Sequence, residues 1–274
     1  MSVRKKLLDF YINSSIHLSI AVVCLAAVTN LVFELPVDIS LLTFIFLSSV
    51  TGYNFIKYAG IARFKHLSLA KDIRVIQVFS FFIFFGLLIS AYYQPMEVIV
   101  LAGIMGIFTL LYALPVFNKN RNLRGLPGVK IYVIAFVVAG VTVLMPLVNN
   151  YDLFQRDILL NFLQRFLIVI ALVLPFEIRD LKYDMAQLGT IPQLLGVPRT
   201  RFLGYLLIGM FLMLEFLKQE IDLASVVGLV VLAILTFFSL KKAVIRQSKY
   251  YASFWVEAVP IAWFIALLLS KKIF

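Results

Sequence analysis

Three carboxylates stand close together in the segment Glu177, Asp180 and Asp184, at the edge of a long apolar run. Their spacing of three and then four residues places them on one face of a helix. Carboxylates so close repel one another unless a positive group lies between them, and a divalent metal, another bound cation or a facing lysine would serve. Mg²⁺ accepts one or two carboxylates together with phosphate oxygens of a ligand. Alternatively, the three are water-solvated residues paired with nearby arginine or lysine side chains.

A second group of polar residues ends another apolar run. Asn54, Lys57 and Lys65 follow it closely, and the two lysines can bind phosphate as point charges. The amide of Asn54 can bind a phosphate or ligate a metal. The alternative is a helix end whose lysines extend to the membrane surface.

A third group is the segment 112–130, which contains no acidic residue and many hydrogen-bond donors, among them Lys119, Arg121 and Lys130. Such a loop can hold a diphosphate or an anionic headgroup. Its charges could equally serve only to set membrane topology.

The composition requires a membrane-embedded chain. Of its 274 residues, 62% are hydrophobic, mean hydropathy is +1.00, and apolar runs of membrane-spanning length recur. Spanning segments of this kind must be helices, because strands would alternate polar and apolar residues. The single cysteine excludes a disulfide within the chain. The net charge of +11 does not indicate nucleic acid, because basic loops on one side of a membrane explain it.

The sequence therefore predicts an all-α polytopic membrane protein with nine transmembrane helices. They are expected at 14–33, 37–56, 74–93, 95–116, 130–149, 158–177, 201–217, 222–240 and 254–270. We expect one membrane domain over 1–274, with a suggested pseudo-repeat of 14–116 and 130–240 followed by the last helix, 254–270.

Basic residues predict the orientation of these spans. With a cytoplasmic N-terminus, only five of the 25 lysines and arginines fall on the other side: Arg156, Arg165, Lys218, Lys271 and Lys272. This asymmetry predicts an N-terminus in the cytoplasm and a C-terminus on the opposite side. The three carboxylates and the end of the second span then share the cytoplasmic face, where we expect the chemistry. Arg165, lying inside a span, is expected to extend outward or to pair with Asp152 or Asp157.

On these residues the chain resembles the UbiA superfamily of intramembrane prenyltransferases, which includes 4-hydroxybenzoate polyprenyltransferase. Segment 177–184, Glu-Ile-Arg-Asp-Leu-Lys-Tyr-Asp, with 189–192, Gly-Thr-Ile-Pro, and 194–196, Leu-Leu-Gly, resembles the family's second Asp-rich motif. Segment 112–115, Tyr-Ala-Leu-Pro, and the basic loop after it resemble the loop after the fourth helix. The nine-span pattern extends the resemblance to the whole chain.

The resemblance implies a helical bundle around a central cavity, which we expect to lie in the bacterial inner (plasma) membrane. It implies Glu177, Asp180 and Asp184 as Mg²⁺ ligands, with Asp180 and Asp184 catalytic. It also implies a prenyl diphosphate held by Asn54, Lys57, Lys65, Lys119, Arg121 and Lys130, and a lipid-soluble acceptor. Membrane lipid is the surrounding partner, and no nucleic acid is involved.

The first Asp-rich motif departs from the family pattern. Asn54 matches its asparagine, but Tyr58 and Ala62 occupy the positions of aspartates, and Lys57 and Lys65 add positive charge. Three interpretations follow. The protein is a prenyltransferase whose lysines replace a second ion. Or Lys57 or Lys65 pairs with Asp180 or Asp184, which gives a non-catalytic relative that binds a lipid or partner. A small-solute transporter is the least favoured interpretation.

Overall fold

The computed structural model describes residues 3–64, 71–114, 128–182 and 189–273, without the side chains of 59–64 and 71–73. These residues form helices and no strand. The helices are α1 (Val3–Asn13), α2 (Ile16–Val32), α3 (Ile39–Phe64), α4 (Lys71–Tyr92), α5 (Met96–Ala113), α6 (Val129–Ala139), α7 (Met145–Leu147), α8 (Arg156–Asp180), α9 (Ile191–Glu215), α10 (Leu223–Lys242) and α11 (Val259–Ile273), with π-helical turns η2 (Gly140–Leu144) and η4 (Tyr251–Val256).

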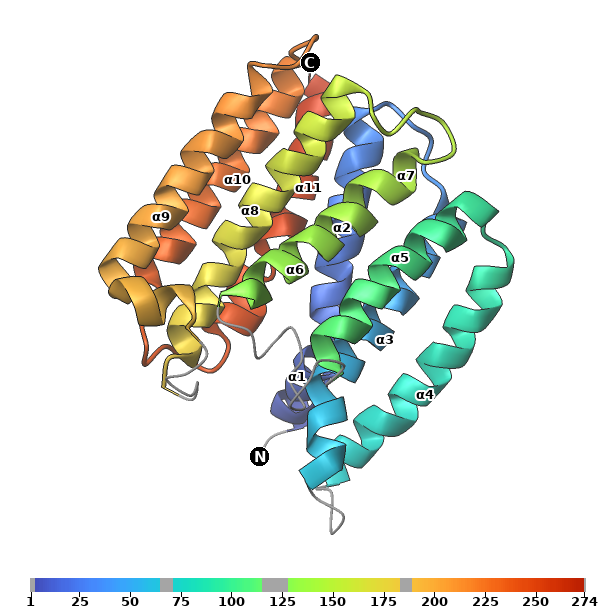
Figure 1. Ribbon diagram of the computed structural model, residues 1–274, viewed down its shortest axis with the longest axis vertical. Helices are drawn as coiled ribbons and strands as arrows, with labels where there is room; N and C mark the ends of the chain where they lie inside the picture. The colour runs from blue at the N-terminus through green and yellow to red at the C-terminus, as the bar shows by residue number, and fades with distance from the viewer. Residues whose placement is uncertain (1–2, 65–70, 115–127, 183–188, 274) are drawn as a thin grey trace.

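The predicted nine-span architecture is confirmed in the described part of the chain. Eight helical segments are long and apolar enough to cross a membrane, and the pair α1 and α2, bent by 52°, supplies a ninth. The termini lie at opposite ends of the bundle (Figure 1), as an odd number of crossings requires. The division into two related halves stays a prediction.

Burial differs strongly among the spans. Helix α8 is the most buried of them and packs against α6, α9 and α10, whereas α4 is mostly exposed and lies at the edge of the bundle (Figure 1). Two large buried apolar clusters result, beside a small one formed by Val143, Leu147 and Ile158. One joins α8 to α9, α10 and α11, and the other joins α2 to α3 and α5. Because α8 lies in the interior, polar side chains on it must find partners inside the bundle.

The start of α9 differs from the predicted span of 201–217. The helix begins at Ile191, where the side chain of Gln193 accepts a hydrogen bond from the backbone N–H of Thr190. It breaks at Gly196, whose φ of 76° is readily adopted only by glycine. Polar residues around this break lower the local hydropathy, which explains why the predicted span begins at residue 201 and not at 191.

Arg165 has different partners from those expected. Its guanidinium donates to the carbonyl of Leu25 at 2.6 Å and to the hydroxyls of Thr142 and Thr29 at 3.2 and 3.3 Å. It also lies 4.9 Å from the ring centroid of Trp263. The expectation that this side chain extends outward or pairs with an aspartate is wrong, because the buried position of α8 directs it into the bundle. It connects α8 to α2, η2 and α11.

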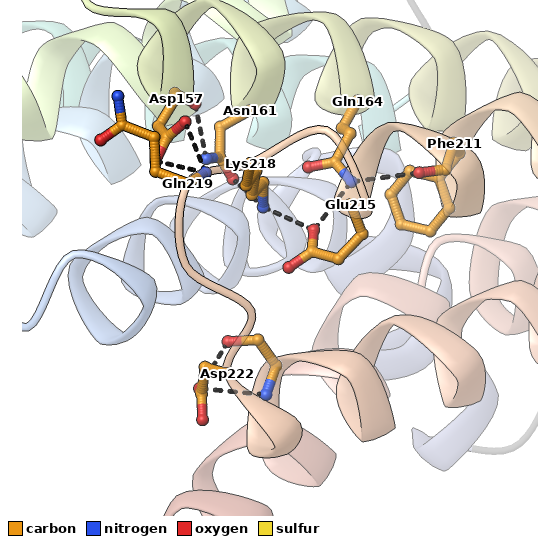
Figure 2. Close-up of polar contacts among 9 residues, drawn as sticks. Asp157, Asn161, Gln164, Phe211, Glu215, Lys218, Gln219 and Asp222 are labelled. Atoms are coloured by element: carbon orange, nitrogen blue, oxygen red, sulfur yellow. Dashed lines mark hydrogen bonds and ion pairs between the residues drawn. The ribbon is translucent and has the colours of Figure 1, made fainter.

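A second polar network lies near the N-terminal half of α8 (Figure 2). The carboxylate of Glu215 accepts from Gln164 at 2.9 Å and lies 2.5 Å from the ammonium of Lys218. Lys218 also donates to the side-chain carbonyl of Asn161 at 3.2 Å. The side chains of Glu215 and Lys218 are only 5% and 7% exposed, so this network ties the end of α9 to α8 in the bundle interior.

The loop after this network ends at the N-cap of α10. Asp222 accepts from the backbone N–H groups of Ala224 and Ser225, both at 3.1 Å, and from the ammonium of Lys271 at 3.0 Å. Burial alone would raise the pKa of Asp222, but the hydrogen bonds from Lys271 and Ser225 outweigh it and lower the pKa. The carboxylate therefore stabilises the fold above the ordinary aspartate pKa, and this stability is lost as the pH falls through the lowered value.

We expect Asp222→Ala to cost about 1–2 kcal/mol at pH 7, because the first turn of α10 loses its cap. Asp222→Asn should cost less, because an amide oxygen still accepts from the backbone. Thermal unfolding at pH 7 and at a pH below the ordinary aspartate pKa of about 3.9 checks both. The difference between wild type and Asp222→Asn should shrink in acid; equal losses for the two variants at pH 7 would contradict the capping role.

Candidate functional site

A cavity of about 550 Å³ opens between the two apolar clusters. Its wall is charged near the ends of α1, α3 and α8 and apolar farther inside. The polar lining consists of Asp9, Asn13, Tyr53, Lys57, Tyr112, Lys130, Glu177, Arg179, Asp180, Lys249, Tyr250, Ser253 and Glu257. The apolar lining includes Leu25 of α2, Val138 of α6 and Val169 of α8, which lie well inside the spans. The cavity thus suits a ligand with a polar head and a hydrocarbon tail.

Glu177 lies in the last turn of α8 and is buried. The ammonium of Lys130, at the start of α6, lies 2.7 Å from its Oε1. The side chain of Lys130 is 20% exposed and that of Glu177 is 3% exposed. Helices α6 and α8 pack side by side, which brings together two residues that the sequence assigned to separate groups. One predicted metal ligand is therefore paired with one predicted diphosphate-binding residue.

Asp180, one turn beyond Glu177, is paired with its neighbour: the Nε of Arg179 donates to Oδ1 at 2.7 Å. Asp184 lies outside the described residues. Within the described ranges, no group of three histidine, cysteine or acidic side chains could hold a metal ion. Glu177 and Asp180 are thus each in contact with a cation of this chain, and the predicted Mg²⁺ site, which also needs Asp184, stays a prediction.

The second predicted group is divided by the structure. Lys57 lines the cavity, and its ammonium donates to the carbonyl of Ile12 at 3.4 Å. Asn54 is buried against α4, where its amide nitrogen donates to Ser80 at 2.9 Å, and it is not part of the described cavity wall. Lys65, Lys119 and Arg121 lie outside the described residues. The proposed ion pair between Lys57 and Asp180 is not formed.

Comparison with solved structures identifies a relative in fold. A structure described as digeranylgeranylglyceryl phosphate synthase in membranes matches with a TM-score of 0.56, covering 98% of each chain at 17% identity. The chain shares that fold. No protein-family model matches the sequence, and no curated protein does. The prediction of an all-α, polytopic helical bundle is thus confirmed at the level of the fold.

Helix α1 contributes a part of the cavity that the sequence did not predict. Asp9 of α1 accepts from the ammonium of Lys249 at 2.5 Å and from the hydroxyl of Tyr250 at 2.8 Å. At the C-terminal end of α1, the hydroxyl of Tyr58 donates to the carbonyl of Asn13 at 3.0 Å. These contacts connect α1 to α3 and to the segment before η4. The basic residues at the start of α1 indicate a segment near a membrane surface, but no sequence pattern predicts which residues α1 contacts.

We expect Asp9→Asn to loosen α1 without unfolding the protein. The hydrogen bond from Asp9 raises the pKa of Lys249, so the pair stabilises the fold below the ordinary lysine pKa of about 10.4 and is lost only as the pH rises through the raised value. Because Lys249 is 60% exposed, the free energy of unfolding should change by less than about 1 kcal/mol. Hydrogen exchange of residues 3–13 should become faster. Unchanged exchange there would contradict a role for this pair in holding α1.

The last cavity feature is Glu257, between η4 and α11. It lines the cavity and is half-buried. The sequence offered one signal for it, an acidic residue inside the predicted span 254–270. Acidic residues inside spans are costly and are commonly functional.

Proposed function

We propose that the protein is a prenyltransferase that moves a prenyl group from a prenyl diphosphate to a lipid-soluble acceptor, aromatic or otherwise. The observation that supports this most is the cavity, whose charged mouth leads into an apolar interior within a UbiA-like fold. A prenyl diphosphate has the same division, with a highly charged head and a hydrocarbon chain. The solved structure that shares the fold is described as digeranylgeranylglyceryl phosphate synthase.

The cations of the cavity wall provide the chemistry. When the bond between prenyl C1 and the diphosphate oxygen breaks, its electron pair stays on the oxygen, and the developing negative charge must be neutralised. Lys57, Lys130 and Arg179 line the cavity and would carry this charge, together with Lys65, Lys119 and Arg121 of the basic loops. An electron pair of the acceptor then forms the new bond to C1, and the acceptor loses a proton.

The proposed setting is a bacterial inner membrane, with the diphosphate site facing the cytoplasm. The distribution of lysine and arginine supports this orientation, which places the N-terminus inside and the C-terminus outside. A soluble, charged diphosphate would then reach the cavity mouth from the cytoplasm, and a lipid-soluble acceptor would reach the apolar interior from the membrane.

Purified protein supplied with radiolabelled geranylgeranyl diphosphate, a panel of acceptors and Mg²⁺ tests this proposal. We expect a labelled lipid product, and we expect Asp180→Asn to abolish its formation. If activity survives Asp180→Ala combined with Asp184→Ala, the assigned site is wrong. The absence of product with every acceptor of the panel would count against the proposed prenyltransferase activity.

One observation supports a second candidate, a non-catalytic relative that binds a lipid or partner. Lys130 already occupies the carboxylate of Glu177 at 2.7 Å, which is the replacement of metal by lysine that this interpretation requires, though with a different lysine from the one expected. Such a protein would bind a non-hydrolysable prenyl thiodiphosphate without turning over the natural diphosphate. Binding and turnover measured together separate the two candidates.

A further inference from the structure

Glu257 is positioned by an irregular stretch of helix. The π-helical turn η4 precedes it, and its own backbone N–H donates to the carbonyl of Ala252, five residues earlier, at 3.2 Å. A π turn accommodates one extra residue and re-aims the side chains that follow it, and such turns are frequent at functional sites. Val256, the last residue of the turn, lies on the cavity wall, as do Glu257 and Pro260 after it.

Glu257 differs from the other three carboxylates that line the cavity. Asp9, Glu177 and Asp180 each lie within 2.5–2.7 Å of a lysine or arginine nitrogen. In the part of the chain that the structure describes, Glu257 has no hydrogen bond and no ion pair within 4.0 Å. The charges of Lys57 and Arg179 act on it only from a greater distance.

This lack of a partner has a cost. A half-buried carboxylate on a largely apolar wall, without a hydrogen-bonding partner, is unfavourable, and the position could be filled by an apolar residue such as those around it. The geometry also offers a use: a ligand group placed between Lys57 of α3 and Glu257 would meet a cation on one side and a hydrogen-bond acceptor on the other. A diphosphate would be repelled by Glu257, so the ligand group that lies next to Glu257 is a hydrogen-bond donor without negative charge.

We infer that Glu257 is the acceptor-binding carboxylate, which accepts a hydrogen bond from a hydroxyl group of the acceptor and then takes its proton. The inference rests on the proposed function. In the transfer, the acceptor oxygen forms a bond to prenyl C1, the bond from C1 to the diphosphate oxygen breaks with its electron pair on the diphosphate, and the hydroxyl proton moves to Glu257. The acceptor class is therefore a lipid-soluble alcohol or phenol.

Chemical labelling tests this assignment without requiring turnover. N,N′-Dicyclohexylcarbodiimide adds to protonated carboxyl groups in apolar surroundings, and an unpaired carboxylate takes up a proton more readily than one held by a cation. In the full-length protein in lipid nanodiscs, peptide mass spectrometry should find the adduct on Glu257 in preference to Glu177 and Asp180. Glu257→Gln should lose it. Equal or preferential labelling of Glu177 or Asp180 would overturn the assignment.

Protection from labelling tests the hydrogen bond itself. Geranylgeraniol should protect Glu257 at about one-tenth the concentration needed by its methyl ether, because only the alcohol has a hydroxyl proton to donate to the carboxylate. Equal protection by the two compounds would overturn the inference. If labelling and selective protection hold but no prenyl transfer is found, Glu257 binds hydroxyl groups and the enzyme proposal alone fails.

In the transfer reaction, Glu257→Gln should lower kcat about 100-fold or more, the usual contribution of a general base. The Kd for a prenyl thiodiphosphate should stay within about threefold, because Glu257 contacts the acceptor and not the donor. Glu257→Asp keeps the carboxylate and should retain part of the activity. An unchanged kcat in Glu257→Gln would contradict the catalytic role.

Discussion

Lys130→Met is expected to lower the free energy of unfolding by about 3 kcal/mol, because it leaves the buried carboxylate of Glu177 without its cation. Glu177 is 3% exposed, and the ammonium of Lys130 at 2.7 Å is its partner in an ion pair. The 20% exposure of Lys130 places the loss toward the lower end of the range for buried pairs. Thermal or denaturant unfolding in detergent measures this loss.

The same variant tests whether lysine stands where a metal could bind. Removing Lys130 frees Glu177 beside Asp180, so Mg²⁺ should raise the unfolding midpoint of Lys130→Met more than that of the wild type. Lys242→Met, at the exposed end of α10, is the matched control and should behave as wild type. An equal Mg²⁺ response of wild type and Lys130→Met would mean that Lys130 does not compete with the ion for Glu177.

The fold could be predicted from the sequence because each span is long and strongly apolar, and the membrane thickness fixes the length of such segments. Hydropathy also explains the errors. Helix α3 continues to Phe64, beyond the predicted end at residue 56, because lysine and tyrosine continue a helix even where they end an apolar run. At the end of a span, helix propensity decides where the helix stops, whereas hydropathy indicates only where the apolar run stops.

The partners of polar residues could not be predicted, because they depend on which helices pack together and at what rotation. Lys130 of α6 and Glu177 of α8 are 47 positions apart in the sequence, and no local sequence pattern relates them. Arg165 likewise has partners from α2 and η2. Glu257 has a visible signal in the sequence, an acid in an apolar span, but its place on the cavity wall follows only from the packing of the helices.

The other large effect is expected in the interior network at the opposite end of α8 from Glu177. Glu215→Leu should destabilise the protein by about 3 kcal/mol, because the buried ammonium of Lys218 loses its ion-pair partner and Asp157 is the negative charge that still acts on it. Lys218 then keeps only the side-chain carbonyl of Asn161, at 3.2 Å. Burial already lowers the pKa of Lys218, and the carboxylate of Glu215 opposes that shift.

Combining Glu215→Leu with Lys218→Met should recover most of the lost stability, because the two charges are removed together and Gln164 still donates to the carbonyl of Phe211 at 3.1 Å. Glu220→Gln, exposed in the following loop, should change stability by less than about 0.5 kcal/mol. A lysine with a lowered folded pKa makes stability rise with pH, since the unfolded state then binds more protons. The deficit of Glu215→Leu should therefore be smaller at pH 9 than at pH 7. A double variant no more stable than Glu215→Leu alone would show that the loss comes from packing and not from an unpaired charge.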